Sequence, residues 1–409
     1  MALEYIDRRG TSSAKWDGLE AIFGRDDLIA MWVADMDFAT AEPVRKALAD
    51  FVANVPFGYY RPPDSFYEAF IEWEKEKHGY EIRREWICTA PGVVSAFYRV
   101  LLMSTRPGDG VIVLTPCYYP MLNAVKDNDR LLVMSDLVNE DGAYRIDYEQ
   151  FENDIIDNNV TLFIMSSPHN PVSRVWTREE LRNLMGICRK HGVLVISDEI
   201  HQDFVWGERK HIPTATVGDY DDMLITMTAL SKTFNLAACQ NSFVIIPDEK
   251  MRARYKDFAK RIAEGELNPF GCVAVETAMR EGGPWLEECR ADIYGNYVYV
   301  KERLAAELPE IKVSELQGTY LLWMDFGAYF DKQAEAEDFL QNRCGVAFDY
   351  GSWFGGERFA RFARMNLATG QANVRRCIDA IVAAAEDVKR ERNGAAVCEA
   401  PQKEEEKNE

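Results

Sequence analysis

The chain reads V-L-V-I-S-D-E-I-H at residues 193–201 and L-I-T-M-T-A-L-S-K-T-F-N at residues 224–235. The first stretch begins with the apolar run V-L-V-I and the second with the mainly apolar run L-I-T-M. Each run predicts a buried strand, and each continues into polar residues. Asp198 follows the first strand and Lys232 follows the second. Ligands in open α/β sheets collect at the carboxyl ends of strands, so the pattern predicts an acid and an amine at a ligand-binding edge.

Other short apolar runs predict further strands, at residues 111–114, 131–134, 162–165 and 243–246. Helical patterns lie between several of them, and residues 177–191 are the clearest example. Thr177 can cap that helix, and Glu180 stands three residues later, as in a capping box. This alternation predicts an α/β fold with a mainly parallel central sheet and helices on both faces.

The order of elements changes after about residue 285. The patterns there predict a helix at 284–308, a strand at 319–326, a helix at 332–343, a strand at 362–367 and a helix at 372–390. This order predicts a smaller α+β domain. The expected division is an N-terminal segment joining the small domain (1–45), a large cofactor-binding domain (46–284), a small C-terminal domain (285–395) and a disordered tail (396–409).

Composition narrows the class of protein. A chain of 409 residues with 47% hydrophobic content can bury a large core, while its net charge of -20 argues against nucleic-acid or anionic-membrane partners. Residues 1–9 lack the apolar core of a secretory signal, and no apolar run is long enough to span a bilayer. The nine cysteines are scattered, which predicts reduced thiols, a cytoplasmic location and no metal site.

Lys232 and Asp198 together predict a site for pyridoxal phosphate (PLP). A lysine amine can hold the cofactor aldehyde as a Schiff base, and a carboxylate can keep the pyridine nitrogen protonated. Alone, a lysine after a strand is most often a surface residue, and an acid there is most often a helix cap. The pair favours the cofactor site over both of these interpretations.

Two further motifs offer cofactor contacts. Residues 167–171 read S-P-H-N-P, and the two prolines fix the backbone so that the Asn170 amide can be aimed at a phenolic oxygen. A rigid turn is the alternative. Residues 90–95 read A-P-G-V-V-S ahead of an amphipathic helix, whose N-terminal amides could cradle a phosphate.

The ordered motifs P-G-V-V, T-P-x-Y-Y-P, S-P-H-N-P, S-D-E-I-H and S-K-T-F-N resemble the fold type I PLP enzymes of the class I/II aminotransferase superfamily. Within it, K-W-D at residues 15–17, W-V-A-D-M-D-F at 32–38 and the histidine of S-D-E-I-H resemble the cystathionine beta-lyase branch of the MalY/PatB type. The resemblance runs from about residue 5 to residue 388.

The resemblance implies roles for individual residues. Lys232 would be the Schiff-base lysine and proton shuttle, Asp198 the partner of the pyridine nitrogen, and Asn170 the contact of the ring hydroxyl oxygen. Tyr118 would stack on the cofactor ring. The phosphate cup would comprise Gly92, Val93 and Ser231.

The substrate and subunit contacts follow from the same resemblance. Arg364 would bind the substrate α-carboxylate with a bidentate fork. Tyr59 would reach the phosphate of the neighbouring subunit, which implies a homodimer with shared sites. The candidates for the substrate pocket are Tyr119, Tyr60, Trp353 and Phe354, although aromatic residues are more often part of the core.

Three positions depart from the broader aminotransferase pattern. His201, also expected to contact the cofactor, stands where many members carry a tyrosine, and Gln240 stands where many carry a phosphate-binding arginine. Both are usual in the lyase branch. Taken alone, His201 is more often a packing histidine. Residues 349–351 read D-Y-G, without the proline expected before that glycine.

The sequence therefore predicts a PLP-dependent carbon-sulfur β-lyase. Its expected substrate is cystathionine or a related L-cysteine S-conjugate, and its products are a thiol, pyruvate and ammonia. One alternative is an aminotransferase on the same fold, because fold and cofactor do not fix the reaction. Another is a PLP-binding protein that acts mainly as a regulator, which the intact lysine and the lack of any DNA-binding module disfavour.

Overall fold

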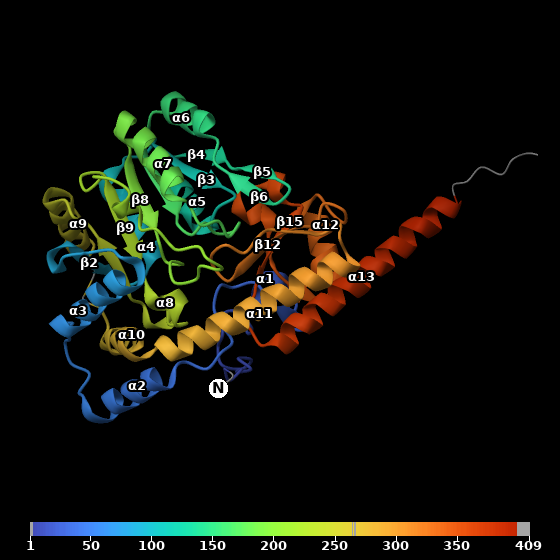
Figure 1. The fold of residues 1–409 in the computed structure, drawn as a ribbon, viewed down its shortest axis with the longest axis horizontal. Coiled ribbons are helices and arrows are strands. Elements are labelled where there is room, and N and C mark those ends of the chain that lie inside the picture. The colour runs from blue at the N-terminus through green and yellow to red at the C-terminus, as the bar shows by residue number, and fades with distance from the viewer. Residues whose placement is uncertain (1–2, 264, 266, 399–409) are drawn as a thin grey trace, which may run out of the picture.

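A seven-stranded sheet forms the centre of the structure, a computed structural model that describes residues 3–263, 265 and 267–398. The strands follow the order β2-β10-β9-β8-β7-β3-β4. Figure 1 labels β2, β9, β8, β3 and β4 of this sheet. Their bounds are Ile87–Ala90 (β2), Gly110–Thr115 (β3), Leu131–Asp136 (β4), Val160–Ser166 (β7), Leu194–Asp198 (β8), Leu224–Thr228 (β9) and Ser242–Ile245 (β10). Strand β10 runs antiparallel to its neighbours β2 and β9, and the other neighbouring pairs of this sheet are parallel, so the predicted mainly parallel sheet is confirmed. The sequence did not predict β2.

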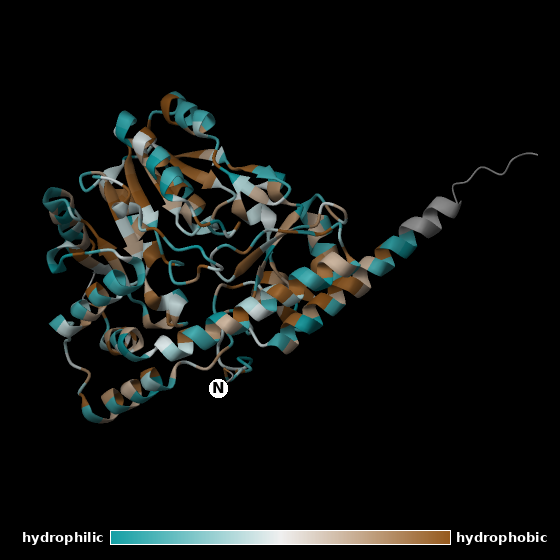
Figure 2. Ribbon diagram, in the orientation of Figure 1, coloured by the Kyte–Doolittle hydropathy of each residue, from teal (hydrophilic) through white to brown (hydrophobic). Residues whose placement is uncertain are grey.

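Helices cover both faces of this sheet. Along β3, Val111 and Val113 pack against one group of helices, whereas Ile112 and Leu114 pack against the other. The first group is α4 (Val93–Ser104), α5 (Tyr119–Lys126) and α9 (Glu249–Arg261), and the second is α6 (Tyr148–Asp157) and α7 (Arg178–His191). Figure 2 shows the strands as a hydrophobic layer between these helices. Burial on both faces explains their continuous apolar sequence.

Helix α7 begins as the sequence predicts. Thr177 is its N-cap, and the Thr177 hydroxyl accepts a hydrogen bond from the Glu180 amide at 3.2 Å. The Glu180 carboxylate accepts one from the Thr177 amide at 2.8 Å, which completes the capping box. Gly192 ends the helix with a left-handed φ of 68°.

A four-stranded antiparallel sheet marks the smaller domain. It has the order β11-β12-β15-β14, with bounds Lys312–Val313 (β11), Leu321–Asp325 (β12), Phe362–Asn366 (β15) and Asp349–Tyr350 (β14). The long helices α11 (Gly283–Glu307) and α13 (Gln371–Cys398) lie side by side next to it (Figure 1). The helix expected at 332–343 is only partly α-helical, because α12 (Gln333–Ala336) continues as a π-helix over Glu337–Arg343.

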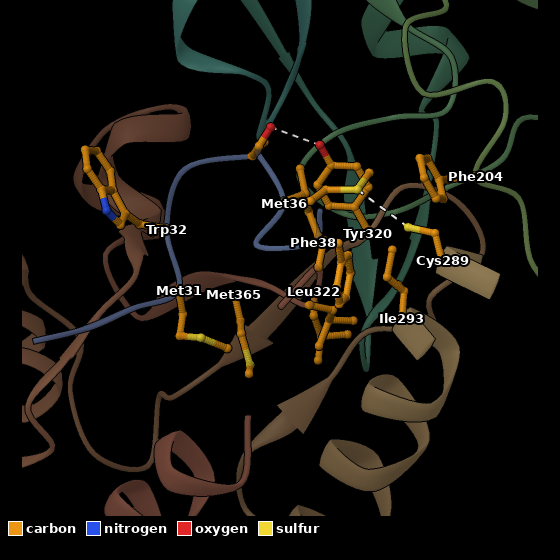
Figure 3. Packing of buried hydrophobic residues seen from close by; sticks show 14 of the residues in the cluster. Met31, Trp32, Met36, Phe38, Phe204, Cys289, Ile293, Tyr320, Leu322 and Met365 are labelled. Atoms are coloured by element: carbon orange, nitrogen blue, oxygen red, sulfur yellow. Dashed lines mark hydrogen bonds between the residues drawn. The ribbon is translucent and has the colours of Figure 1, made fainter. Parts of the chain in front are cut away.

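The N-terminal segment is attached to the smaller domain. Strand β1 (Ile29–Ala30) pairs in parallel with β13 (Val346–Ala347). Met31, Met36 and Phe38 lie in one buried cluster with residues of β12 and β15 (Figure 3). These contacts support the division that we propose, with residues 1–45 joined to the small domain 285–395 and residues 46–284 forming the large domain.

A buried ion pair ties the two N-terminal motifs together. Lys15 Nζ donates to Asp37 Oδ2 at 2.7 Å, and both side chains are fully buried. Trp16 Nε1 donates to Asp37 Oδ1 at 2.9 Å, and Trp32 Nε1 donates to the Lys15 carbonyl at 2.8 Å. The K-W-D and W-V-A-D-M-D-F motifs therefore form one packed unit.

The remaining elements complete the two domains. The other α-helices are α1 (Leu19–Phe23), α2 (Glu42–Asn54), α3 (Asp64–Trp73), α8 (Leu230–Thr233) and α10 (Pro269–Glu281), and a hairpin joins β5 (Val138–Glu140) to β6 (Ala143–Arg145). Helix α13 continues to Cys398, beyond the expected start of the tail at residue 396, and residues 399–409 lie outside the described part of the chain. Within the described residues, no helix is long and apolar enough to cross a membrane.

Candidate active site

A cavity of about 180 Å³ lies where β7, β8 and β9 end. Eight of the residues predicted for the site line it: Gly92, Val93, Tyr118, Asn170, Asp198, His201, Ser231 and Lys232. They come from separate segments of the large domain, which the parallel strands bring to one edge. Arg364 lies directly behind Asn170, whereas Tyr59 and Tyr119 are not part of the lining.

Lys232 presents its amine from α8, just after β9. Its Nζ donates a hydrogen bond to the Ala34 carbonyl at 2.6 Å. Burial lowers the pKa of Lys232 to about 8, the charge of Arg364 acts in the same direction, and the carboxylates of Asp35 and Asp198 oppose it. The amine is therefore far more often neutral near physiological pH than that of an exposed lysine, and a neutral amine is nucleophilic and basic.

Asp198 ends β8, the strand beside β9. Its Oδ1 accepts a hydrogen bond from the Ile200 amide at 3.1 Å. Burial raises the pKa of Asp198 to about 7, and the hydrogen bond from Ile200 and the charge of Lys232 reduce this effect. A cationic N–H group in the cavity would hold this carboxylate in its charged form, so Asp198 suits a protonated pyridine nitrogen.

Two buried polar atoms in the cavity wall have no hydrogen-bond partner among the described residues. One is His201 Nδ1, and the other is Asn241 Oδ1. Burial and the charges of Lys232 and Arg364 hold the pKa of His201 well below its usual value, so its ring is neutral. Unpaired buried groups are costly, which indicates that a bound polar molecule completes their contacts. Sequence reasoning singled out Gln240 and missed its neighbour Asn241.

The N-terminus of α4 faces the same cavity. Gly92 is its N-cap and supplies no side-chain cap, so the first amides of the helix remain available to an anion. A Cβ atom on Gly92 would meet nothing within 4 Å, so the space in front of the helix is open. Ser231 lines the cavity as well. This arrangement fits a phosphate group.

Asn170 links the cavity to Arg364. Its Oδ1 accepts a hydrogen bond from Arg364 Nη1 at 3.0 Å. Because that contact uses the amide oxygen, the Nδ2 hydrogens are the part of the amide that can serve a phenolic oxygen. The loop carrying Asn170 is fixed by a hydrogen bond from Trp176 Nε1 to the Ser166 carbonyl at 2.9 Å.

The segment 32–38 closes one wall of the site. The Ala34 carbonyl accepts from Lys232 Nζ and also from the Tyr320 hydroxyl at 2.9 Å, the dashed line at Tyr320 in Figure 3. The Asn235 side chain accepts from the Met36 amide and donates to the Met36 carbonyl, both at 2.9 Å. The segment therefore positions the loop that carries the lysine. Its motif was noted only for the resemblance, and its place in the site was missed.

Aromatic side chains extend from the cavity toward the small domain. The ring of Tyr118 lies 5.2 Å from that of Tyr119, which in turn lies 6.1 Å from Trp353 and 5.9 Å from Phe354. Burial raises the pKa of the Tyr118 phenol, so the phenol stays protonated. This chain of rings suits the apolar part of a substrate.

Tyr59 and Tyr60 lie apart from this group. The Tyr59 side chain is fully exposed, and the Tyr60 ring contacts Phe51 at 6.5 Å. Neither tyrosine lines the cavity. A contact between Tyr59 and a bound phosphate would therefore have to be made in another subunit.

A buried network lies behind the two catalytic candidates, and sequence reasoning did not find it. Glu199 pairs with His211 Nε2 at 2.8 Å, and Asp203 pairs with His78 Nε2 at 3.0 Å. The Thr233 hydroxyl donates to Asp203 at 2.6 Å. Since Glu199 follows Asp198 and Thr233 follows Lys232, these contacts fix the backbone beside both groups. No group of three or more His, Cys, Asp or Glu residues in the described chain is arranged to hold a metal ion.

Comparison with known proteins agrees with this geometry. The family described as Aminotransferase class I and II matches residues 26–381. Cystathionine beta-lyase PatB of Bacillus subtilis is 40% identical over 374 residues, covering 90% of this chain and 97% of that protein.

Two solved structures share the fold. The PLP-bound putative aminotransferase from Clostridium difficile has a TM-score of 0.90 at 37% identity and covers 93% of this chain and 98% of its own. The PLP-bound C-S lyase from Staphylococcus hominis has a TM-score of 0.87 at 32% identity, with coverage of 93% and 97%. These findings confirm the predicted family and fold class, and the chain belongs to the class I and II aminotransferase family.

Proposed function

We propose that the chain is a PLP-dependent carbon-sulfur β-lyase that cleaves cystathionine or a related L-cysteine S-conjugate. The observation that carries the proposal is the placement of Lys232 and Asp198 at the ends of adjacent strands in one cavity. The similarity to the cystathionine beta-lyase PatB and to the C-S lyase of Staphylococcus hominis supports the lyase reaction.

The lining residues fit PLP. Lys232 would hold it covalently, Asp198 would face the pyridine nitrogen, and the amides at Gly92 would bind the phosphate. Tyr118 would pack on the ring and Asn170 Nδ2 would donate to the ring hydroxyl oxygen. When bound, the cofactor supplies an electron-withdrawing ring that stabilises negative charge at the substrate α-carbon.

The protein's own groups would then carry out proton transfer and orientation. The Lys232 amine, with its pKa lowered to about 8, removes the proton from the α-carbon once it is free of the cofactor. Arg364 orients the substrate carboxylate, and the aromatic side chains around Tyr119 accept the thiol portion. The sulfur leaves the β-carbon as a thiolate, and hydrolysis of the remaining fragment gives pyruvate and ammonia.

Product stoichiometry separates a lyase from an aminotransferase. Purified enzyme supplied with cystathionine and no keto acid should release homocysteine, pyruvate and ammonia in equal amounts over many turnovers. β-Elimination consumes no amino acceptor, so nothing limits the number of cycles. The measurement is the quantity of each product against the quantity of active sites.

The aminotransferase alternative predicts a different result. Without a keto acid it would stop after one half-reaction per site, and it would resume when a keto acid is added. That outcome would replace the lyase proposal, and the C-S bond of cystathionine would stay intact. This alternative has to be tested because the chain is also similar to a structure described as a putative aminotransferase from Clostridium difficile.

We also propose a cytoplasmic homodimer with shared sites. Large apolar side chains lie exposed on the segments near Tyr59: Val52, Val55, Phe57 and Phe270. Such a group of side chains suits an interface with a second subunit. Eight cysteines in the described chain are unpaired and seven of them are buried, which supports a reducing compartment.

Mixing two inactive or weakened chains tests whether sites are shared. Lys232→Ala and Tyr59→Phe subunits should form mixed dimers with one doubly altered site and one intact site. Random subunit exchange makes about half of the dimers mixed, so roughly a quarter of all sites should be intact. Activity of the mixture should therefore exceed the mean of the two separate variants. A fully active monomer, by sedimentation, would contradict the shared site.

A further inference from the structure

Asp349 forms an ion pair with Arg364, the residue that we propose binds the substrate carboxylate. The two residues are directly opposite each other on β14 and β15. Arg364 Nη2 donates to Asp349 Oδ2, and both side chains are almost completely buried. Asp349 belongs to the D-Y-G stretch that departs from the expected proline, and its role is not explained by the proposed reaction.

Asp349 contacts Nη2 of Arg364, the nitrogen that a bidentate ligand of this guanidinium must use. A guanidinium offers two pairs of neighbouring donors, Nε with Nη2 and Nη1 with Nη2, so Nη2 belongs to both. Here Nη2 also donates to the Trp32 carbonyl at 3.4 Å, while Nη1 donates to Asn170 at 3.0 Å. Arg364 Nε has no partner among the described residues. A carboxylate can therefore form a bidentate contact only by displacing either Asp349 or the longer contact to the Trp32 carbonyl from Nη2, and in both cases it lies beside the Asp349 carboxylate.

We propose that Asp349 is an internal competitor for the carboxylate site, and that it takes up a proton when a substrate carboxylate binds to Arg364. This inference rests on the proposed function, because that function assigns the carboxylate to Arg364. It adds a property of this chain: the Asp349 carboxylate lowers the affinity of Arg364 for the substrate carboxylate, and this affinity depends on pH.

The surroundings of Asp349 favour proton uptake. The groups that act on it electrostatically are the cations of Arg364 and Lys232, and the phenols of Tyr118 and Tyr119 face it as well. Burial raises the pKa of Asp349, and the two cations counter this effect. A second carboxylate beside it would weaken the hold of Arg364 and add like charge, and both changes favour the protonated form.

The sign of the pH dependence follows from linkage. If Asp349 binds a proton more tightly in the complex than in the free enzyme, carboxylate binding is accompanied by proton uptake. Affinity then rises as pH falls, by up to about tenfold per pH unit where one proton is taken up. Proton release by another group could alter the total slope, so the comparison must be made against a variant that lacks only this carboxylate.

The test uses the PLP-loaded enzyme and an Asp349→Asn variant. Asparagine has the same shape and can still accept from Arg364 Nη2, so the guanidinium keeps its position. The probe is propionate, which has a carboxylate but no amine to react with the cofactor. Propionate should compete with cystathionine, and its Ki should fall roughly tenfold in the variant because a like charge has been removed. The variant should also lose the pH slope of Ki and the proton uptake seen by calorimetry in different buffers.

Asp325→Asn is the matched control. Asp325 lies on β12 of the same small sheet and pairs with Arg361, outside the cavity. Its removal changes the net charge by the same amount, so Ki and its pH slope should stay within twofold of wild type. An equal effect of both variants would mean that net charge alone is responsible, which overturns the role of Asp349.

Other outcomes distinguish this inference from the proposed function. Unchanged Ki and pH slope in Asp349→Asn, or no competition between propionate and cystathionine, overturn the inference while pyruvate release from cystathionine still supports the lyase. If cystathionine yields no pyruvate, the lyase proposal fails, and calorimetric binding of propionate still tests Asp349 independently.

Discussion

Lys232→Ala is expected to lower turnover by about 10⁴-fold or more and to abolish covalent attachment of the cofactor. The substitution removes the only atom proposed both to hold the cofactor and to move the α-proton. The fold should survive, because Lys232 faces the cavity and contributes one hydrogen bond, to the Ala34 carbonyl. Circular dichroism and thermal unfolding of the variant check that expectation.

Borohydride reduction followed by peptide mapping identifies the attachment site directly. The label should lie on the peptide containing Lys232. Lys15 is the natural comparison, because it is also buried, but its Nζ is held by Asp37 at 2.7 Å. A label on Lys15 or on any other lysine would contradict the assignment, even if Lys232→Ala were inactive.

The lowered pKa of Lys232 gives the same assignment a pH dependence. Because burial lowers this pKa to about 8, the neutral amine of the cofactor-free enzyme becomes more abundant as pH rises toward that value. The rate of covalent PLP attachment should therefore increase with pH and level off above about 8. A rate that continued to rise toward pH 10 would indicate an ordinary exposed lysine instead.

The elements that local sequence signals determine were predictable. Apolar runs predicted six of the seven strands in the central sheet, and Thr177 with Glu180 predicted the start of α7. The ends of the strands then placed Asp198 and Lys232 near each other, because adjacent parallel strands end at the same edge. Strand β2 was missed because its four residues, I-C-T-A, include only one large aliphatic side chain.

The remaining site features depend on contacts between distant segments. The Ala34 carbonyl accepts a hydrogen bond from Lys232, which lies 198 residues later in the chain. Since every residue has a backbone carbonyl, no sequence pattern identifies the one that accepts this bond. Asp349 meets Arg364 only because β14 pairs with β15 in one particular register. Asn241 was missed because the sequence analysis considered only its neighbour Gln240, which departs from the aminotransferase pattern. In each case the residue could be identified only from the tertiary structure.

The buried pairs behind the site, Glu199 with His211 and Asp203 with His78, also join residues that are separated in the sequence. Glu199 lies in the S-D-E-I-H motif and Asp203 lies two residues after it, yet their partners His211 and His78 are 12 and 125 residues away. A buried carboxylate needs such a partner, but nothing local in the sequence identifies which histidine supplies it. The network is consistent with a rigid support for the two groups that carry the chemistry.

Replacing Asp198 should have the second largest effect. In Asp198→Ala, the pyridine nitrogen would lose its anionic partner, so negative charge at the α-carbon would be less well stabilised. Buried charge pairs of this kind are worth about 3 to 5 kcal/mol, which corresponds to a roughly 10² to 10⁴-fold loss of kcat. Asp198→Asn should show a similar loss, although its amide can still accept from the Ile200 amide as Asp198 does at 3.1 Å.

Asp136→Asn provides the control for this measurement. Asp136 also ends a strand of the central sheet, β4, but it is exposed, pairs with Arg358 at 2.7 Å and lies outside the cavity. Its replacement removes the same charge and should leave kcat within a few-fold of wild type. All variants must be compared at full PLP loading, which absorbance of the bound cofactor reports. Near wild-type kcat in a folded, PLP-loaded Asp198→Ala enzyme would refute the pairing of Asp198 with the ring nitrogen.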